Sequence, residues 1–443
     1  MGSHSTAAEH NGKSFNSGSS VEVKSESSPI QQLQPPATNS SVYDVPDGGT
    51  LAWLQVLASF FVLMNTWGII NTFGAYQTFY EVDLLRSHSP SAISWIGSIQ
   101  GCLLSIVGAL TGPISDAGHT RALLLAGSFL VVLGTVMTSL VEQYYQAFLA
   151  QGVCFGIGAG MLFVPSVAVV STYFEKHRSF AVGVLASGSS LGGVIYPAIF
   201  HQLQPKIGFG WATRVIALAA LVTLTITNLA TRQRVLPTMR RKLFDVSALH
   251  EAPFVLCTMG IFFGFVGLYI PFFFITPYAL AKTGANSTLA FYFVPILNAA
   301  SVFGRIAPNA LADRIGTLNT LVPCAFFCAV LAFAWIAVES TGGLIVFAIF
   351  YGFFSGSFVA LPPSTITALS KDLRKVGTRL GMSFAVGGLG VLIGSPVGGA
   401  LLNLKTGEFV HAQVFCAVAM MISCVSLAMA RVAKSGFAIM IKS

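Results

Sequence analysis

The sequence predicts an all-α integral membrane protein with twelve transmembrane helices in two six-helix halves. Of its 443 residues, 54% are hydrophobic and only 9% are charged, whereas an ordinary soluble domain has about 25% charged residues. The mean hydropathy is +0.74. A third observation is that glycine, proline and aspartate positions in the first half of the chain recur in the second half, which predicts the division into two similar halves.

Twelve apolar runs are long enough to cross a bilayer, since a helix needs about 20 apolar residues to do so. In the first half we expect spans at 52–78, 91–113, 121–140, 145–172, 180–203 and 211–230. In the second half we expect spans at 253–278, 288–309, 318–337, 342–369, 377–402 and 410–432.

The segments outside these spans divide the chain into parts. Residues 1–45 are rich in Ser, Gln, Asn and Pro and contain no apolar run, so a disordered tail is expected there and not a signal peptide. The longest inner loop contains the basic stretch TRQRVLPTMRRKL, which either binds anionic lipid or only sets the topology. The expected parts are a tail at 1–45, halves at 46–230 and 253–432, a linker at 231–252 and a second tail at 433–443.

The basic residues predict the orientation. If both termini lie in the cytosol, the inner segments carry 18 of the 24 Lys and Arg residues and the outer loops carry 5, as the positive-inside rule requires. We therefore expect a multi-pass protein of the cell membrane with both ends cytosolic, and the choice between plasma and vacuolar membrane stays open. The sequon at Asn286 then lies in an outer loop and is a candidate glycosylation site, whereas the sequon at Asn39 lies inside and should be unused.

The repeat has a nearly constant offset of 196 to 198 residues. The paired positions are Gly156 with Gly352, Gly160 with Gly356, Asp116 with Asp313, Pro165 with Pro362, and Gly183 with Gly381. Agreement at five pairs favours a duplication over chance. Two six-helix halves related by an axis along the membrane normal are the arrangement of the major facilitator transporters, which bind substrate between the halves near the middle of the membrane.

Glycines recur every four residues within three of the expected spans. Such stripes allow helix backbones to approach closely, and packing is the simplest role for them. The stripes are Gly152, Gly156 and Gly160; Gly188 and Gly192; and Gly390, Gly394 and Gly398.

Two inner loops resemble the inner-loop motif of that superfamily, G-x-x-x-D-R-x-G. The first reads GPISDAGHTR and the second NALADRIG. Ala117 and His119 depart from the motif in the first copy, and Asn309 departs from it in the second. An aspartate at a helix end can accept bonds from the N-terminal amides of a neighbouring helix. The resemblance therefore suggests an inner gate, although the charges could simply terminate spans. The expected gating residues are Asp116, Arg121, Asp313 and Arg314.

Two further stretches narrow the family. PDGGTLAW at 46–53 precedes the first span, and YFEKHRSFAVGVLASG at 173–188 runs into the fifth. Together they resemble the signatures of the monocarboxylate transporter family in the form of its fungal members. With the twelve spans, the resemblance covers nearly all of the chain after residue 45.

Arg305 is the principal candidate for substrate binding. Asn298, Ser301 and Arg305 form one polar face of an apolar helix, and a charge within the membrane suggests a functional site. In the monocarboxylate family an arginine of span 8 binds the substrate carboxylate, and the resemblance places Arg305 at that position. A guanidinium can hold a carboxylate through two parallel bonds. The alternative is that Arg305 extends to the nearby inner interface.

The sequence departs from the family at its coupling residues. Members that move lactate with a proton have an aspartate one turn before this arginine and a lysine in span 1, where this chain has Ser301 and Asn71. Coupling therefore uses another group, such as Glu81 or Asp83, or is absent. Further expected cavity residues, which could instead bond between helices, are Asn65, Asn71, Tyr76, Tyr269 and Tyr351.

The function that follows is secondary transport of a small organic acid or related metabolite, with efflux of a fungal secondary metabolite preferred. Uptake of a monocarboxylate or a vitamin such as riboflavin, or nutrient sensing on a transporter fold, stay as alternatives. The expected partners are the small-molecule substrate and the lipid bilayer, with no nucleic acid and no nucleotide, and the expected state is a monomer or weak oligomer. An enzyme is not expected, because no histidine cluster has a catalytic spacing.

No cofactor and no metal are expected, because the seven cysteines lack metal-ligand spacing. Gly12-Lys13-Ser14 has Ala7 where a phosphate-binding loop requires glycine.

Overall fold

Helices make up nearly all of the part of the chain that the structure describes. This computed structural model describes residues 47–233, 243–370, 372, 375–403 and 407–436, and these residues belong to one compact unit that begins at Val45. The tail at 1–45 and the basic run at 234–242 thus lie outside the described residues, as does Asn39. The only extended pairing in the described part is an isolated bridge between Asn403 and Glu408.

The first half of the unit contains helices α1 to α8, several of them consecutive pieces of one apolar run. Their bounds are α1 Thr50–Asn65, α2 Trp67–Asn71, α3 Phe73–Phe79, a π-helical turn Tyr80–Leu84, α4 Pro90–Ile114, a π-helical turn Ser115–His119, α5 Thr120–Thr138, α6 Tyr144–Ala147, a π-helical segment Phe148–Cys154, α7 Phe155–Ser171 and α8 Arg178–Ala230.

The second half contains helices α9 to α15. Their bounds are a 3-10 turn Val246–His250, α9 Ala252–Lys282, α10 Ser287–Ile315, α11 Thr317–Ala334, a 3-10 turn Trp335–Ala337, α12 Thr341–Ala360, α13 Pro362–Leu369, α14 Val376–Ala400 and α15 Val410–Ser435. The last helix therefore extends three residues beyond the expected boundary at 432.

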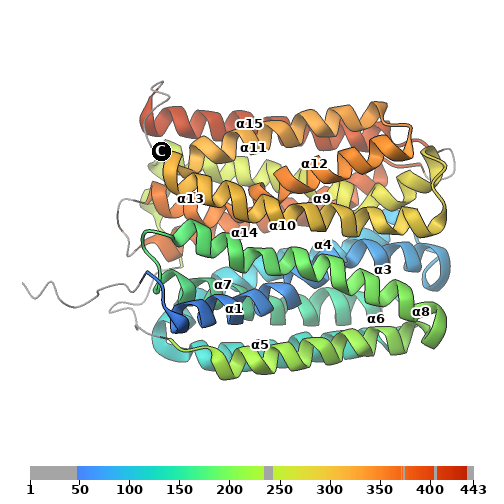
Figure 1. The fold of residues 1–443 in the computed structure, drawn as a ribbon, viewed down its shortest axis with the longest axis horizontal. Coiled ribbons are helices and arrows are strands. Elements are labelled where there is room, and N and C mark those ends of the chain that lie inside the picture. Colours follow the sequence, from blue (N-terminus) through green and yellow to red (C-terminus); the bar gives the residue numbers. More distant parts are fainter. Residues whose placement is uncertain (1–46, 234–242, 371, 373–374, 404–406, 437–443) are drawn as a thin grey trace, which may run out of the picture. The chain divides into compact units, whose positions relative to one another are not determined.

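Ten helical segments of the described residues are long and apolar enough to cross a membrane. Two of them, Pro90–Thr138 and Arg178–Ala230, have 49 and 53 residues, more than twice what one crossing needs. Each contains a glycine with positive φ, Gly118 at 91° and Gly208 at 78°, a conformation that a residue with a Cβ rarely adopts. Figure 1 shows α8 turning back on itself. The number of twelve spans stays a prediction.

The positions related by the sequence repeat pack in equivalent ways. A Cβ added at Gly156 would meet the carbonyl oxygen of Gln100 at 3.0 Å, and one at Gly352 would meet that of Leu297 at 2.2 Å. Gln100 and Leu297 are themselves separated by the repeat offset of 197 residues. Close packing of α4 on α7 in the first half is therefore repeated as close packing of α10 on α12 in the second, as a duplication predicts.

The same comparison reveals where the halves differ. At the repeat offset of 197, the counterpart of Arg305 is Gly108 of α4. A Cβ at Gly108 would meet the Val164 side chain at 2.9 Å, so the first half fills this position with a tightly packed glycine. The buried cation belongs to the second half alone.

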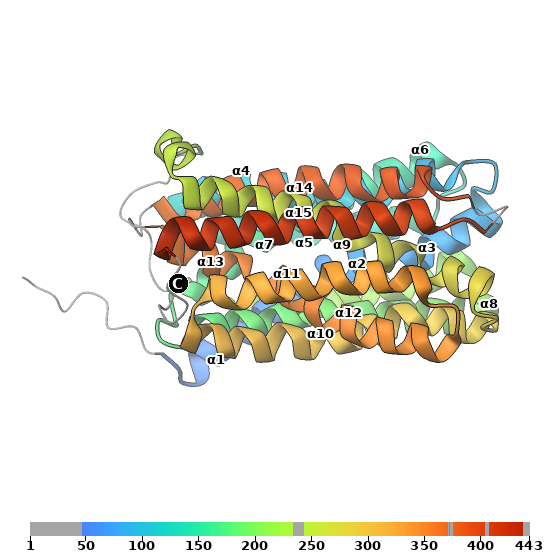
Figure 2. The same ribbon diagram turned by 90° about the horizontal axis from the view of Figure 1, so that it is seen from above.

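The main contacts between the two halves are those of α8 with α10 and of α4 with α14, and α3 also packs against α9. The pair α4 and α14 can be followed side by side in Figures 1 and 2. Both views also show that α1 begins and α15 ends at the same end of the bundle, which we call the terminal end. The other end is called the opposite end.

The glycine stripes predicted from the sequence lie at close helix contacts within each half. A Cβ at Gly188 or Gly192 would come within 2.6 Å of a carbonyl oxygen of α1, and one at Gly390 or Gly394 within 2.5 Å of a carbonyl oxygen of α9. These distances are shorter than real Cβ contacts, so only glycine allows the backbones to approach this closely. The expected packing role is confirmed.

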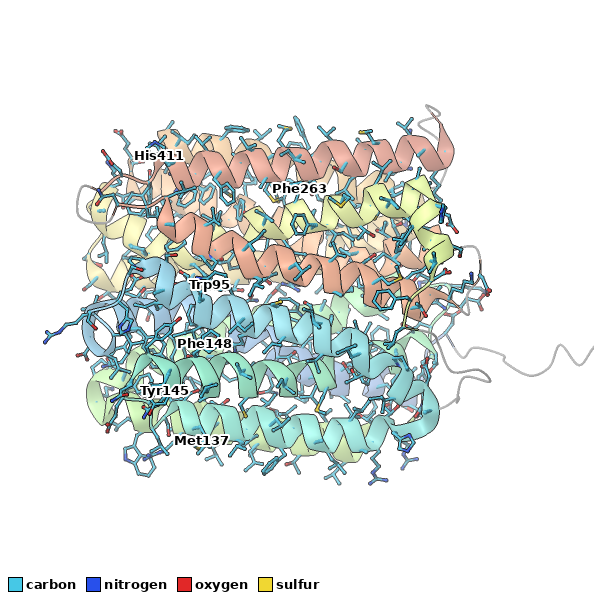
Figure 3. All side chains as sticks on the ribbon, turned by 180° about the vertical axis from the view of Figure 1, so that it is seen from behind. Trp95, Met137, Tyr145, Phe148, Phe263 and His411 are labelled. Carbon is cyan, nitrogen blue, oxygen red and sulfur yellow. The ribbon has the colours of Figure 1, made fainter. Side chains whose placement is uncertain are left out.

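Apolar side chains also cover the outside of the bundle. Trp95, Met137 and Tyr145 are 39%, 46% and 57% exposed, and Figure 3 labels them on the face that it shows. Large exposed apolar side chains on many helices are unfavourable in water and suit contact with lipid.

Candidate functional site

A cavity between the two halves reaches the terminal end. Its volume is about 280 Å³. The last turns of α7 and α13 and the first turns of α8 and α14 contribute to its wall, so each half supplies two helix ends. Its lining includes the hydroxyl-bearing residues Ser171, Thr172, Ser364 and Thr367 and the cationic residue Arg178.

A narrower pocket of about 20 Å³ adjoins this cavity, and Arg305 is one of the residues that line it. The two share Val167, Val182 and Pro363 in their walls. Arg178 and Arg305 are the charged side chains of the combined lining, and both are cationic. Such a passage attracts anions by its sign of charge.

The Arg305 side chain is buried, with 4% exposure. One terminal nitrogen donates to the carbonyl oxygen of Ala186 at 3.4 Å, and its Nε has no hydrogen-bond partner. No carboxylate forms an ion pair with it among the described residues. A buried guanidinium without a counterion is costly, and an anion in the pocket would remove that cost.

Arg305 belongs to a row of four polar side chains on α10 that faces small residues of α8. We call this row and its partners the polar seam. Along the seam Asn298 contacts Gly193, Ser301 Oγ donates to Ser190 Oγ at 2.6 Å, Arg305 donates to Ala186, and Asn309 Cβ lies against Gly183. The polar face predicted for Asn298, Ser301 and Arg305 therefore lies between the halves. Asn309 extends this polar face by one helical turn. The sequence alone identified it only as a departure from the inner-loop motif.

Aromatic rings from both halves surround the pocket. Trp67 lines it, and its ring is nearly parallel to those of Tyr269 and Phe265, at 3° and 11°, with centroids 6.3 and 6.4 Å apart. Phe163 packs edge-on against Phe384 across the halves, with centroids 5.5 Å apart. We call these five residues the ring cluster. The break between α1 and α2, where Thr66 has φ −105° and ψ −85°, precedes Trp67.

Of these five residues the sequence singled out Tyr269 alone. Aromatic residues are 12% of the chain, so no local pattern separates rings that face a pocket from rings that face lipid. The signal lies in contacts between distant helices, which one sequence does not display.

Four other predicted cavity residues bond between helices in this structure. Asn65 accepts from Tyr196 at 2.6 Å and donates to Thr223 at 2.8 Å. The further bonds run from Asn71 Nδ2 to the Ser189 carbonyl oxygen at 3.4 Å, from the Tyr76 hydroxyl to Thr213 Oγ1 at 3.4 Å and from the Tyr351 hydroxyl to the Leu268 carbonyl oxygen at 3.1 Å. None of the four lines the pocket at Arg305.

Asp313 makes the type of contact expected of it. Its Oδ2 accepts from the amide of Phe180 in the first turn of α8, at 3.0 Å, so the last turn of α10 is bound to a helix of the other half. Asp116 is buried in the π-helical turn between α4 and α5. Arg121 and Arg314 are exposed.

The two stretches that carry the monocarboxylate resemblance touch each other. Asp47 of the first accepts from the amides of Glu175 and Lys176 of the second, at 2.6 and 2.9 Å. These bonds, that from Glu175 foremost, lower the pKa of the Asp47 carboxyl below its ordinary value. The Trp53 ring of the first stretch packs edge-on against the rings of Phe174 and Phe180.

Arg305 is one of two buried arginines among the described residues. Arg379, in the first turn of α14, is 3% exposed. It donates to Asp245 at 3.1 Å and is paired with Glu251. This group could not be predicted from the sequence, because its acids lie about 130 residues earlier, in the loop before α9.

Asp245 also holds two other polar groups. It accepts from Ser247 Oγ at 2.5 Å and from Lys375 Nζ at 3.1 Å. The hydrogen bond from Ser247, with those from Lys375 and Arg379, lowers the pKa of the Asp245 carboxyl to about 2.

Contacts between the halves close the opposite end. Ser91 Oγ donates to the carbonyl oxygen of Pro396 at 3.0 Å. The rings of Phe73 and Phe273 have centroids 5.2 Å apart, and those of His201 and Phe291 are 4.0 Å apart and nearly parallel. The larger cavity is therefore reached from the terminal end in this structure.

Two remaining candidates lie near the opposite end. Glu81 Oε1 accepts from Gln77 Nε2 at 2.8 Å, and Gln77 Oε1 accepts from Ser94 Oγ at 3.3 Å; the neighbouring Asp83 is exposed. Asn286 is exposed and its side-chain oxygen accepts from the amide of Leu289 at the start of α10. No group of three His, Cys, Asp or Glu side chains suited to a metal occurs among the described residues.

Comparison with known proteins agrees with this architecture. Residues 53–343 match the family model of the Major Facilitator Superfamily. The MFS-type transporter dbaD of Emericella nidulans is 46% identical over 399 residues, which cover 89% of this chain and 90% of that protein. MFS-type transporter 1 of an Ophiocordyceps species is 38% identical over 417 residues, or 93% and 92% of the two chains. The aspyridones efflux protein apdF of Emericella nidulans is 37% identical over 397 residues, or 89% and 81%.

Proposed function

Because this chain belongs to the Major Facilitator Superfamily, we propose that it exports a small organic acid or related secondary metabolite by alternating access, with Arg305 as the anion-binding residue. The observation that carries this proposal is the buried Arg305 guanidinium, which lines the small pocket beside the cavity and lacks a counterion among the described residues.

The chemistry of the passage favours an anion. A carboxylate can accept two parallel bonds from one guanidinium, and the unpaired Nε of Arg305 supplies a donor. Arg178 adds a second cation nearer to the terminal end. The rest of the lining is apolar or carries hydroxyl groups, which suits a metabolite with one acidic group on a mainly apolar body.

The arrangement of the helices supports alternating access. The cavity reaches the terminal end, while contacts between the halves close the opposite end. The proposed halves are residues 46–230 and 253–432, and the linker 231–252 joins them. We assign the terminal end to the cytosol from the distribution of basic residues. Twelve spans follow if the two double-length segments each cross twice, as the positive φ of Gly118 and Gly208 suggests.

Export is the proposed direction for two reasons. A relative that is 37% identical is named as an efflux protein for aspyridones. In addition, Ser301 and Asn71 stand where lactate transporters have their titratable pair. The contact of Asp47 with the 173–188 stretch supports the finer assignment to the monocarboxylate-like branch. If protons are coupled, Glu81 is the proposed group.

The cell membrane is the proposed location, with both termini in the cytosol. This orientation places the exposed Asn286 outside, where it is a candidate for glycosylation. Asp116 and Asp313 are the proposed gating residues, with Arg121 and Arg314 beside them.

The test compares metabolites inside and outside cells in a strain lacking the gene and in strains carrying Arg305→Ala or Arg214→Ala. Arg214 is the matched control, because it lies on α8 against Trp211 and Ser139 and outside the cavity. We expect one acidic compound to accumulate inside the deletion and Arg305→Ala strains and to fall outside, with Arg214→Ala behaving as wild type. If Arg305→Ala transports as wild type does, Arg305 is not the binding residue. A compound that disappears from inside the deletion strain would instead show uptake.

A further inference from the structure

The ring cluster lies across the plane along which the two halves must separate. Trp67 and Phe163 belong to the first half, whereas Phe265, Tyr269 and Phe384 belong to the second. Every ring contact between the halves in this cluster is therefore lost when the pocket widens. The pocket has only about 20 Å³ in this structure, which is close to the space of one water molecule, so substrate enters only after such widening.

The geometry of the rings determines what shape the widened space has. The planes of Trp67 and Tyr269 differ by 3°, those of Trp67 and Phe265 by 11°, and those of Phe265 and Tyr269 by 9°. Because the ring planes are nearly parallel, movement of the halves apart along the normal of these planes opens a flat slot with Trp67 on one side and Phe265 and Tyr269 on the other. A planar ring that enters the slot restores the stacking contacts that the separation removes.

Arg305 favours a negative charge on any ligand that enters this pocket. Arg305 and Trp67 both line the narrow pocket, and Trp67 is 4% exposed. A ligand that stacks on Trp67 therefore has its edge near the guanidinium. A negative charge on that edge pairs with Arg305, while the remaining wall, formed by residues such as Leu63, Leu185 and Val359, is apolar.

We propose that the site takes a flat, conjugated organic anion, whose ring inserts between Trp67 of the first half and Tyr269 and Phe265 of the second while its acidic group binds Arg305. This inference rests on the proposed function and specifies its substrate class. Neither an aliphatic acid nor an uncharged aromatic compound satisfies both parts of the site.

The experiment uses the full-length protein purified in detergent and three probes of similar outline. 2-Naphthoate is flat and anionic, decahydro-2-naphthoate is anionic but puckered, and 2-naphthamide is flat but neutral. Binding is measured by equilibrium dialysis of each radiolabelled probe at neutral pH. The variants are Trp67→Leu, Arg305→Gln and, as a matched control, Trp95→Leu, since Trp95 is 39% exposed on the outside of α4.

We expect 2-naphthoate to bind at least about fivefold more tightly than either of the other probes, since one aromatic contact is typically worth a factor of about two to ten. Trp67→Leu should remove the preference for the flat acid over the puckered one but keep the preference for acid over amide. Arg305→Gln should do the reverse, and Trp95→Leu should change neither.

Three outcomes overturn the inference. Equal binding of the two acids, abolished by Arg305→Gln, excludes the flat slot and leaves the proposed function intact. Equal binding of 2-naphthoate and 2-naphthamide excludes the charge requirement and contradicts the proposed role of Arg305 as well. No measurable binding of 2-naphthoate at millimolar concentration excludes this substrate class, while the export proposal is still decided by the metabolite comparison.

Discussion

The amide of Phe180 donates to Asp313 Oδ2 at 3.0 Å, and this bond joins the first turn of α8 to the last turn of α10. It lies at the terminal end of the polar seam. A carboxylate at this position interacts with the positive end of the α8 dipole as well as with one amide. The bond therefore stabilises the contact between the halves at the end from which the cavity is reached.

We predict that Asp313→Asn slows transport about two- to fivefold, because loss of a charge at a helix N-terminus typically costs about 0.3–1 kcal/mol. Initial rates of export from cells with equal amounts of protein provide the measurement. Arg86→Gln is the control, since Arg86 is exposed and lies outside the proposed gate. If both variants have wild-type rates, the Asp313 contact does not contribute to the transport cycle.

Gly352→Ala should destabilise the fold, whereas Gly342→Ala on the same helix should not. A Cβ at Gly352 would lie 2.2 Å from the Leu297 carbonyl oxygen, whereas one at Gly342 meets nothing within 4 Å. Overpacking typically costs about 1–3 kcal/mol, and alanine in an open helical position is neutral or stabilising. Thermal unfolding of the purified proteins measures the difference. Equal midpoints would mean that α10 and α12 can separate freely.

The Asp245 group predicts a stability that depends on acid pH. The pKa of Asp245 is lowered to about 2 from an ordinary 3.8, so its ionised form stabilises the fold above about pH 4, and this contribution is lost as the pH falls toward 2. Asp245→Asn should therefore lower the midpoint of thermal unfolding at pH 7, and the gap from wild type should shrink at pH 3.

The control for this prediction is Glu142→Gln, because Glu142 is exposed. A gap between wild type and Asp245→Asn that is the same at pH 7 and pH 3 would show that the carboxylate charge does not contribute to stability.

The orientation of the chain predicts where its ends can be detected. Epitope tags added at residue 1 and after residue 443 should bind antibody only after the cells are permeabilised, since the basic residues favour cytosolic termini. A tag inserted after Thr283, in the loop between α9 and α10, should bind antibody on intact cells. Labelling of either terminal tag on intact cells would reverse the proposed orientation.

A structural feature could be predicted from the sequence when the residues that form it lie close together along the chain. The apolar runs are local, so most spans could be predicted to within a few residues. The polar face of Asn298, Ser301 and Arg305 follows from helical spacing alone, and the repeat offset indicated which glycines have equivalent contacts.

Features built from distant segments could not be predicted. The ion pairs of Arg379 could not be predicted, because its partners Asp245 and Glu251 lie 134 and 128 residues away. The rings that meet across the halves, such as Trp67 and Tyr269, have no periodicity that separates them from lipid-facing rings. Asn65 and Tyr351 form hydrogen bonds with neighbouring helices, which is the alternative to a place in the cavity that the sequence left open for them.

The second half has Arg305 where the first half has Gly108 at the equivalent position. This difference limits the number of negative charges that the substrate can carry. The narrow pocket contains one fixed cation, Arg305, which α10 of the second half supplies. A dianion would have to bring its second charge into an apolar, low-dielectric space without compensation, which costs several kcal/mol. Monoanions should therefore be selected over dianions of the same skeleton, and each should bind in one orientation, with its acidic end toward α10.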